Sequence, residues 1–167
     1  MTEQEHIELL RAEIAREVRD EALFDALSAA AVAEHPDSAV LWCRRGDAIS
    51  LMHDPHAEGP PSEALACYRH AAELAPSFAE AWEEIGHYLD THLDAFEEAE
   101  AAFRKAIVLG APASARIGLA RVLAQRSERD AALDSLNGAE SANGERDEIE
   151  AMRQGIKDGV WGAPKRC

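Results

Sequence analysis

The chain has 167 residues, of which 47% are hydrophobic and only 5% aromatic, and its formal net charge is −15 at pH 7. Such a surface repels nucleic-acid phosphates and anionic lipids alike, so neither a nucleic acid nor a membrane is an expected partner. A basic partner would be attracted, although the same charge is compatible with a role in solubility alone.

The sequence shows no targeting or disulfide pattern. Residues 1–13 are charged and lack a continuous apolar stretch, unlike a signal peptide. No apolar run approaches the roughly 20 residues that a membrane-spanning helix needs. The three cysteines, Cys43, Cys67 and Cys167, are odd in number and form no C-x-x-C pair, which suits a reducing compartment. We therefore expect a cytoplasmic protein.

Apolar residues recur at helical spacing along nearly the whole chain, and Ala, the strongest helix former, is abundant. Capping signals divide this pattern into short helices: Thr2 with Glu5 fits a capping box, and Asp37 is a candidate N-cap. The pattern predicts nine helices, in chain order at about residues 3–17, 20–35, 38–52, 63–75, 78–92, 94–109, 113–126, 128–142 and 145–157. Brief turns between such helices indicate antiparallel hairpins. Residues 53–61, rich in Pro and Gly, form a predicted loop, and residues 159–167 a non-helical tail.

Two segments of the chain share one residue skeleton. The first segment has Trp42, Gly46, Ala64, Tyr68, Ala71 and Pro76, and the second has Trp82, Ile85, Gly86, Ala99, Phe103 and Ala106. A third, weaker copy contains Arg116, Leu119, Ala120, Leu123, Ala132, Leu136 and Ala139. Trp82 and Arg116 are 116 − 82 = 34 positions apart, whereas Trp42 and Trp82 are 82 − 42 = 40 apart. The extra residues of the first segment fall in the predicted loop.

This skeleton resembles the tetratricopeptide repeat (TPR), a helix–turn–helix unit of about 34 residues with the pattern W-x2-L-G-x2-Y…A-x3-F-x2-A…P. The resemblance is good over about residues 37–142, although Arg45 stands where the family has Leu. It implies an all-α, right-handed superhelix (α-solenoid) of antiparallel helix hairpins, with about three repeats, an N-terminal hairpin and a C-terminal capping helix. We expect one domain over residues 1–158, followed by the tail 159–167.

The repeat positions also have a physical explanation in packing. Gly46 and Gly86 fit places where a side chain would hold two helices apart, opposite the small residues Ala64 and Ala99. The aromatic positions would fill the space between neighbouring hairpins. Because Arg116 replaces Trp in the third copy, the third repeat is predicted to be the least tightly packed.

In this family the first helix of each repeat lines a concave groove that binds partner proteins, and the resemblance implies which positions lie there. These positions are, repeat by repeat, Val40, Cys43, Asp47 and Ser50, then Glu80, Glu83, His87 and Asp90, then Ser114, Ile117, Arg121 and Ala124. Spacings of three and four place each set on one helical face. The middle of the groove is acidic, which favours a Lys- or Arg-bearing protein or peptide. An ordinary solvated helix face is the alternative.

The residues of the chain do not form a known catalytic or cofactor-binding motif of the Ser-His-Asp, H-E-x-x-H, P-loop or G-x-G-x-x-G type. His53 and His56 are of metal-ligand type, but a loop offers no rigid support, so a solvated loop is the favoured interpretation and no metal site is predicted. Cys43 and Cys67 are interpreted as small buried hydrophobic residues.

The leading hypothesis is therefore a non-enzymatic adaptor that uses no cofactor and binds another protein or peptide as a monomer or weak homodimer. One alternative is a structural homo-oligomer. The other is a small thiol- or metal-dependent enzyme that uses Cys43 and Cys67 or the loop between His53 and His56.

Overall fold

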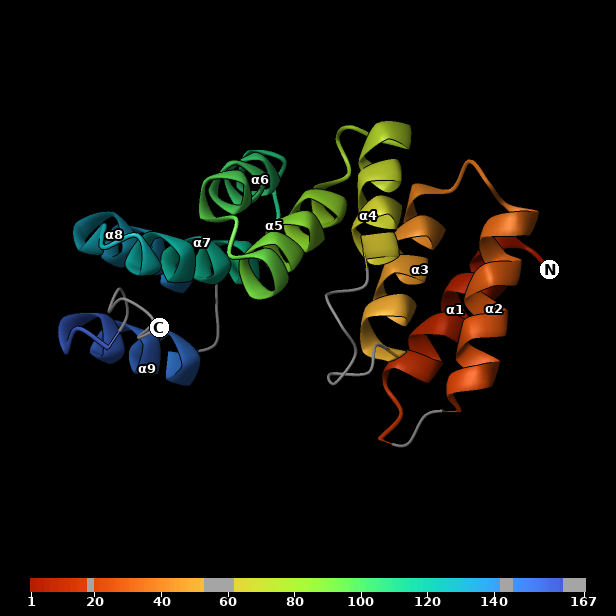
Figure 1. Ribbon diagram of the computed structural model, residues 1–167, viewed down its shortest axis with the longest axis horizontal. Helices are drawn as coiled ribbons and strands as arrows, with labels where there is room; N and C mark the ends of the chain where they lie inside the picture. The colour runs from red at the N-terminus through yellow and green to blue at the C-terminus, as the bar shows by residue number, and fades with distance from the viewer. Residues whose placement is uncertain (18–19, 53–61, 142–145, 161–167) are drawn as a thin grey trace. The chain divides into compact units, whose positions relative to one another are not determined.

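The computed structural model of the chain describes residues 1–17, 20–52, 62–141 and 146–160. Within these ranges the protein consists of nine α-helices and contains no strand (Figure 1). The helices are α1 Glu3–Ile14, α2 Glu21–Glu34, α3 Ala39–Met52, α4 Ser62–Leu74, α5 Ala79–Leu93, α6 Phe96–Val108, α7 Ala113–Gln125, α8 Arg129–Ser141 and α9 Arg146–Lys157. The all-α prediction is confirmed, and every helix ends within a few residues of its predicted bounds. In the described ranges, none of these helices has the length and apolar character needed to cross a membrane.

Local capping interactions set several helix ends. Thr2 and Glu5 form the predicted capping box of α1: the Glu5 amide donates to Thr2 Oγ1 at 3.3 Å, and the Thr2 amide donates to Glu5 Oε2 at 2.8 Å. The prediction of Asp37 as the N-cap of α3 is wrong, because the Leu41 amide donates to Ser38 Oγ at 3.2 Å. Each cap satisfies an amide that has no partner inside its helix.

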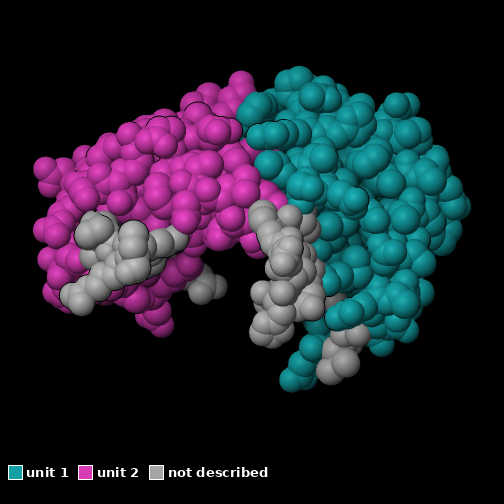
Figure 2. Space-filling model, viewed as in Figure 1, with its two compact units in different colours: residues 1–84 teal, residues 85–167 magenta. Residues whose placement is uncertain are grey.

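The chain divides into two compact units, residues 1–84 and residues 85–167 (Figure 2). The first unit holds α1 to α4 and the beginning of α5. The second holds the remainder of α5 and α6 to α9. The expectation of one domain over residues 1–158 stays a prediction.

In the first unit, α3 packs against α1, α2 and α4. The buried core of this unit includes Ile7, Leu10, Phe24, Ala31, Leu41 and Ala48. Arg45, which departs from the TPR pattern, contacts α2 through polar groups: its Nη1 donates to Asp25 Oδ1 at 2.5 Å and to Ser28 Oγ at 2.8 Å. The arginine thus joins α3 to α2 by hydrogen bonds and an ion pair instead of the apolar contact that a leucine would make.

In the second unit, α7 packs against α6, α8 and α9. Nine of its 13 residues are buried, against four of 14 in α3, so the prediction that the third repeat is the least tightly packed is wrong for its first helix. Small residues explain the difference, because Ala113, Ala115, Gly118, Ala120 and Ala124 let neighbouring helices approach α7 closely.

The repeat glycines lie where an aromatic ring of a neighbouring helix approaches the backbone. A Cβ atom at Gly46 would lie 2.5 Å from the Tyr68 ring. Phe103 on α6 is enclosed from two helices, because a Cβ at Gly86 would lie 2.8 Å from its ring and one at Gly118 would lie 2.5 Å from it. Glycine is therefore required for close packing, as predicted, but the facing group is an aromatic ring and not the expected alanine.

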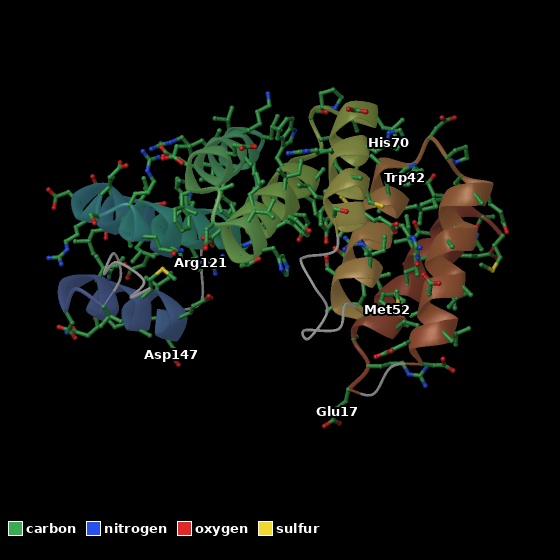
Figure 3. The ribbon with its side chains drawn as sticks, in the orientation of Figure 1. Glu17, Trp42, Met52, His70, Arg121 and Asp147 are labelled. Atoms are coloured by element: carbon green, nitrogen blue, oxygen red, sulfur yellow. The ribbon has the colours of Figure 1, made fainter. Side chains whose placement is uncertain are left out.

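The tryptophans fix the entry to each repeat through the same hydrogen bond. Trp42 Nε1 donates to the Pro36 carbonyl at 2.7 Å, and Trp82 Nε1 donates to the Pro76 carbonyl at 3.1 Å. This bond explains why Trp follows Pro by six positions in both segments. The rings of Trp42 and His70 on α4 also pack at a right angle, with centroids 4.7 Å apart (Figure 3).

Candidate binding surfaces

On the first unit, four polar side chains join α3, α4 and α5; we call Arg44, Asp47, Tyr68 and Glu80 the Arg44 cluster. One terminal nitrogen of Arg44, Nη1, donates to Asp47 Oδ2 at 2.5 Å, and the other, Nη2, donates to Glu80 Oε1. The Tyr68 hydroxyl donates to Asp47 Oδ1 at 3.1 Å. A single arginine therefore connects α3 to α5 and compensates two carboxylates.

Burial governs the electrostatics of the Arg44 cluster. Only 12% of the Arg44 side chain and 14% of the Asp47 side chain are exposed, against 36% for Glu80. Burial raises the pKa of the Asp47 carboxyl, and Arg44 opposes that shift only in part. Burial alone would lower the pKa of Arg44, but the carboxylates of Asp47 and Glu80 outweigh it and raise that pKa further. Burial, followed by the charge of Asp47, raises the pKa of Tyr68, so its hydroxyl remains a hydrogen-bond donor.

On the second unit, a carboxylate from α5 is held by α7; we call His87, Asp90, Arg121 and Gln125 the Asp90 cluster. Arg121, labelled in Figure 3, donates from Nε to Asp90 Oδ2 at 2.5 Å. Gln125 Nε2 donates to Asp90 Oδ1 at 2.9 Å, and Arg121 Nη2 lies 3.4 Å from His87 Nδ1. The Asp90 side chain is 1% exposed and that of Arg121 is 26% exposed. Both oxygens of the buried carboxylate thus have a donor, and of this ion pair only Arg121 is accessible to solvent.

The predicted groove positions differ in how much surface they offer. The buried ones are Cys43, Glu83, Asp90, Ile117 and Ala124. The half-buried ones are Val40, Asp47, Ser50, Glu80, His87 and Arg121, whereas Ser114 is exposed. Direct contact with a partner would therefore depend on the half-buried and exposed positions. The local charge is also less negative than the sequence suggests, because two arginines compensate three of the acids.

Sequence reasoning missed three members of these clusters. Arg44 precedes Asp47 by three positions, and that helical spacing was the available signal. Tyr68 was assigned to packing alone, although its hydroxyl also contacts Asp47. Gln125 gave no signal, since its contact with Asp90 depends on how α5 and α7 pack.

The two described cysteines are poorly suited to nucleophilic chemistry. Cys43 is fully buried, Cys67 is 7% exposed, and neither forms a disulfide. Burial raises the pKa of both thiols, and at Cys43 the negative charge of Asp47 adds to the effect. Both side chains are therefore protonated at neutral pH, as their interpretation as small hydrophobic residues requires. The candidate ligands His53 and His56 lie outside the described residues.

Comparison with solved structures identifies the fold. The crystal structure of PilW, a type IV pilus biogenesis factor, matches with a TM-score of 0.77 and 18% identity, over 93% of this chain and 73% of PilW. TTC0263, a thermophilic TPR protein of Thermus thermophilus, matches with a TM-score of 0.73 and 17% identity, over 96% of this chain and 82% of TTC0263. The chain has the TPR fold.

A third structure with the TPR fold is YrrB, which is described as a TPR protein with an unusual peptide-binding site. It matches with a TM-score of 0.64 and 23% identity, over 80% of this chain and 66% of YrrB. No protein-family model and no curated protein matches the sequence. The fold confirms the resemblance seen in the repeat skeleton. That skeleton assigns α3, α5 and α7, which hold most of both clusters, as the first helices of the repeats.

Proposed function

We propose that the chain is a non-enzymatic module that binds a segment of a partner protein through the polar faces of α3, α5 and α7. The Arg44 cluster carries the proposal. Its ion pairs and hydrogen bonds hold charged groups in a fixed geometry on the first helix of a repeat, and Glu80 keeps 36% of its side chain exposed. Groups that are ordered before binding lose little conformational entropy when a partner arrives.

The partner segment is proposed to carry Lys or Arg side chains. The formal net charge of −15 attracts a basic partner at long range, and Glu80 offers a carboxylate at the exposed edge of the Arg44 cluster. Because Arg44 and Arg121 compensate neighbouring acids, the local attraction is moderate, and binding should weaken as salt rises. The peptide-binding site for which YrrB is described is consistent with a peptide-like ligand.

The alternatives receive less support. A thiol enzyme needs a stabilised thiolate, whereas the pKa of both Cys43 and Cys67 is raised. We propose a monomer or weak homodimer over a structural homo-oligomer, and light scattering distinguishes the two. A cytoplasmic location, with both described cysteines free, is part of the proposal.

The experiment uses solvent-accessible positions, because replacing the buried Asp90 would test folding and not binding. Native lysate is passed over immobilised wild type and over the double variant Glu80→Lys/Ser114→Lys, which changes two first-helix positions. The matched control is Asp134→Lys/Ala101→Lys, at exposed positions of α8 and α6. Each double substitution replaces one acid and one neutral residue by Lys, so both change the net charge equally.

Circular dichroism first establishes that both variants are folded. We expect a basic protein to be retained by the wild type and the control, and at least about tenfold less by the first-helix variant. The captured protein is then titrated against all three chains at two salt concentrations. Equal retention by all three would contradict the proposal, because the binding surface would then lie elsewhere.

A further inference from the structure

Three side chains outside both clusters converge where α1 begins and α2 ends. One ligand-type atom from each of His6, Glu34 and His35 lies within 4.8 Å of the others. His6 Nε2 is 3.3 Å from Glu34 Oε2, and the two histidine rings meet edge to face with centroids 5.6 Å apart. His6 is 28 positions from Glu34 in the chain, so packing of α1 against α2 creates this arrangement.

The local backbone brings the two consecutive residues Glu34 and His35 to one place. Glu34 is the last residue of α2, and His35 is its C-cap with φ −131° and ψ 67°. The chain leaves the helix at His35, so its ring does not follow the helical rotation that normally separates neighbours by about a quarter turn. His6 lies in the first turns of α1 and is 1% exposed.

The donor set suits a particular class of ion. Two imidazole nitrogens and one carboxylate oxygen form a mixed donor set that Zn²⁺, Co²⁺ and Ni²⁺ accept, whereas Ca²⁺ and Mg²⁺ prefer oxygen donors alone. Ligand atoms about 2.1 Å from a tetrahedral ion lie roughly 3.4 Å from one another. The 3.3 Å between His6 Nε2 and Glu34 Oε2 already matches that separation. A pair of ligand atoms at the 4.8 Å limit would need to approach by only about 1.4 Å to reach it.

The surroundings of the three side chains fit an ion-binding site. The Nδ1 atom of His6 is buried and has no hydrogen-bond partner among the described residues, so Nε2, which faces Glu34, is the ring nitrogen placed to bind an ion. His35 donates from Nε2 to the Met1 carbonyl at 2.9 Å, the kind of outer contact that fixes a metal-binding histidine. The Glu34 side chain is 49% exposed, so an ion could enter from solvent and keep a water molecule as a further ligand.

The N-terminal amine is the competing partner of the carboxylate. It lies 2.8 Å from Glu34 Oε2. His6 Nε2 approaches the same oxygen, so an ion bound to Oε2 would take the place of the amine.

We propose that His6, Glu34 and His35 form a binding site for a divalent transition-metal ion, with Zn²⁺ as the best fit. This site is independent of the proposed partner-binding faces. An ion there would tie the start of α1 to the end of α2 and stabilise the N-terminal hairpin.

The test is a titration of the full-length, tag-free, EDTA-treated chain with Co²⁺, followed by competition with Zn²⁺. Ligand-field absorption of Co²⁺ reports coordination directly, and calorimetry gives the stoichiometry. The variants are His35→Ala and Glu34→Gln, since replacing the fully buried His6 risks unfolding the hairpin. The control is His53→Ala/His56→Ala, which removes the other histidine pair suggested by the sequence.

We expect one ion per chain in the wild type and the control, and at least a tenfold loss of affinity in both site variants. The unfolding temperature should rise with Zn²⁺ in the wild type and control only, with circular dichroism confirming that every variant is folded. Absence of saturable binding by the wild type would overturn the proposal. Loss of binding in the control with retention in His35→Ala would equally overturn it, because the ion would then be held by the loop.

Discussion

The packing of Phe103 gives the sharpest test of the structure, because two mid-helix glycines in the same unit should respond in opposite ways to one methyl group. At Gly118 on α7, a Cβ would lie 2.5 Å and 2.6 Å from the Phe103 ring and 3.1 Å from His87. At Gly138 on α8, it would lie 2.9 Å from Arg116 Nη1, the far end of a flexible side chain. The ring is fully buried and cannot move aside, whereas the guanidinium can.

The magnitudes follow from two opposing effects. Replacing Gly by Ala inside a helix gains about 1 kcal/mol of helix propensity. Overpacking a filled core costs about 1–3 kcal/mol, and the three close contacts at Gly118 place that site in the upper part of this range. We therefore expect Gly118→Ala to lose about 1–2 kcal/mol of unfolding free energy and Gly138→Ala to gain up to about 1 kcal/mol.

Urea denaturation followed by circular dichroism measures both variants under the same conditions. A difference of about 2 kcal/mol corresponds to roughly 4–8 °C in Tm for a chain of this size. Adding Phe103→Leu to Gly118→Ala should recover part of the loss, because a smaller side chain makes room for the methyl group. Equal stability of the two alanine variants would refute the close approach of α7 to the Phe103 ring.

The remaining predictions concern hydrogen bonding, ion pairing and thiol reactivity. Trp42→Phe removes the donor to the Pro36 carbonyl and should lower the unfolding free energy by about 0.5–1.5 kcal/mol in urea; an unchanged midpoint would show that the bond contributes nothing. Arg121→Met leaves the buried Asp90 carboxylate without its cation and should cost about 2–4 kcal/mol at pH 7, somewhat below the value for a fully buried pair because Gln125 still donates. An unchanged urea midpoint of this variant would contradict the assignment. Cys43, whose pKa is raised by burial, should react at pH 8 at least about tenfold more slowly with a disulfide reagent in the folded chain than in urea, and equal rates would contradict its burial.

Repetition made the fold accessible from sequence. A helical period, the spacing of Trp42 from Gly46 and its recurrence at Trp82 and Gly86 predicted hairpins of the TPR type, and the structure confirms the all-α fold. Helix capping was less predictable, because Asp37 and Ser38 are both good N-cap residues and only the backbone geometry selects Ser38.

The error about the third repeat has a clear cause. Loss of the Trp at position 116 suggested loose packing, since a large side chain was missing. The alanines of α7 compensate by allowing α6, α8 and α9 to approach closely, so that nine of its 13 residues are buried. A prediction based only on the large side chains of the repeat therefore underestimates how tightly helices pack through small residues.

The candidate binding positions were predicted from repeat register, but their charge was not. Asp47, Glu80 and Asp90 are acidic in the sequence, which indicated an acidic face. In the structure they are compensated by Arg44 and Arg121, and Asp90 is almost completely buried. Register specifies which face of a helix a residue occupies, whereas its partner depends on a second helix.

The sequence by itself thus determined the helices, their hairpin arrangement and the repeat, because these depend on periodicity and on contacts between residues close in the chain. Only the tertiary structure decided which charges are paired, which glycines face a ring, and that His6 meets Glu34 and His35. These contacts join residues up to 36 positions apart in the chain. Their geometry is set by helix packing, whose distances and rotations no local pattern encodes.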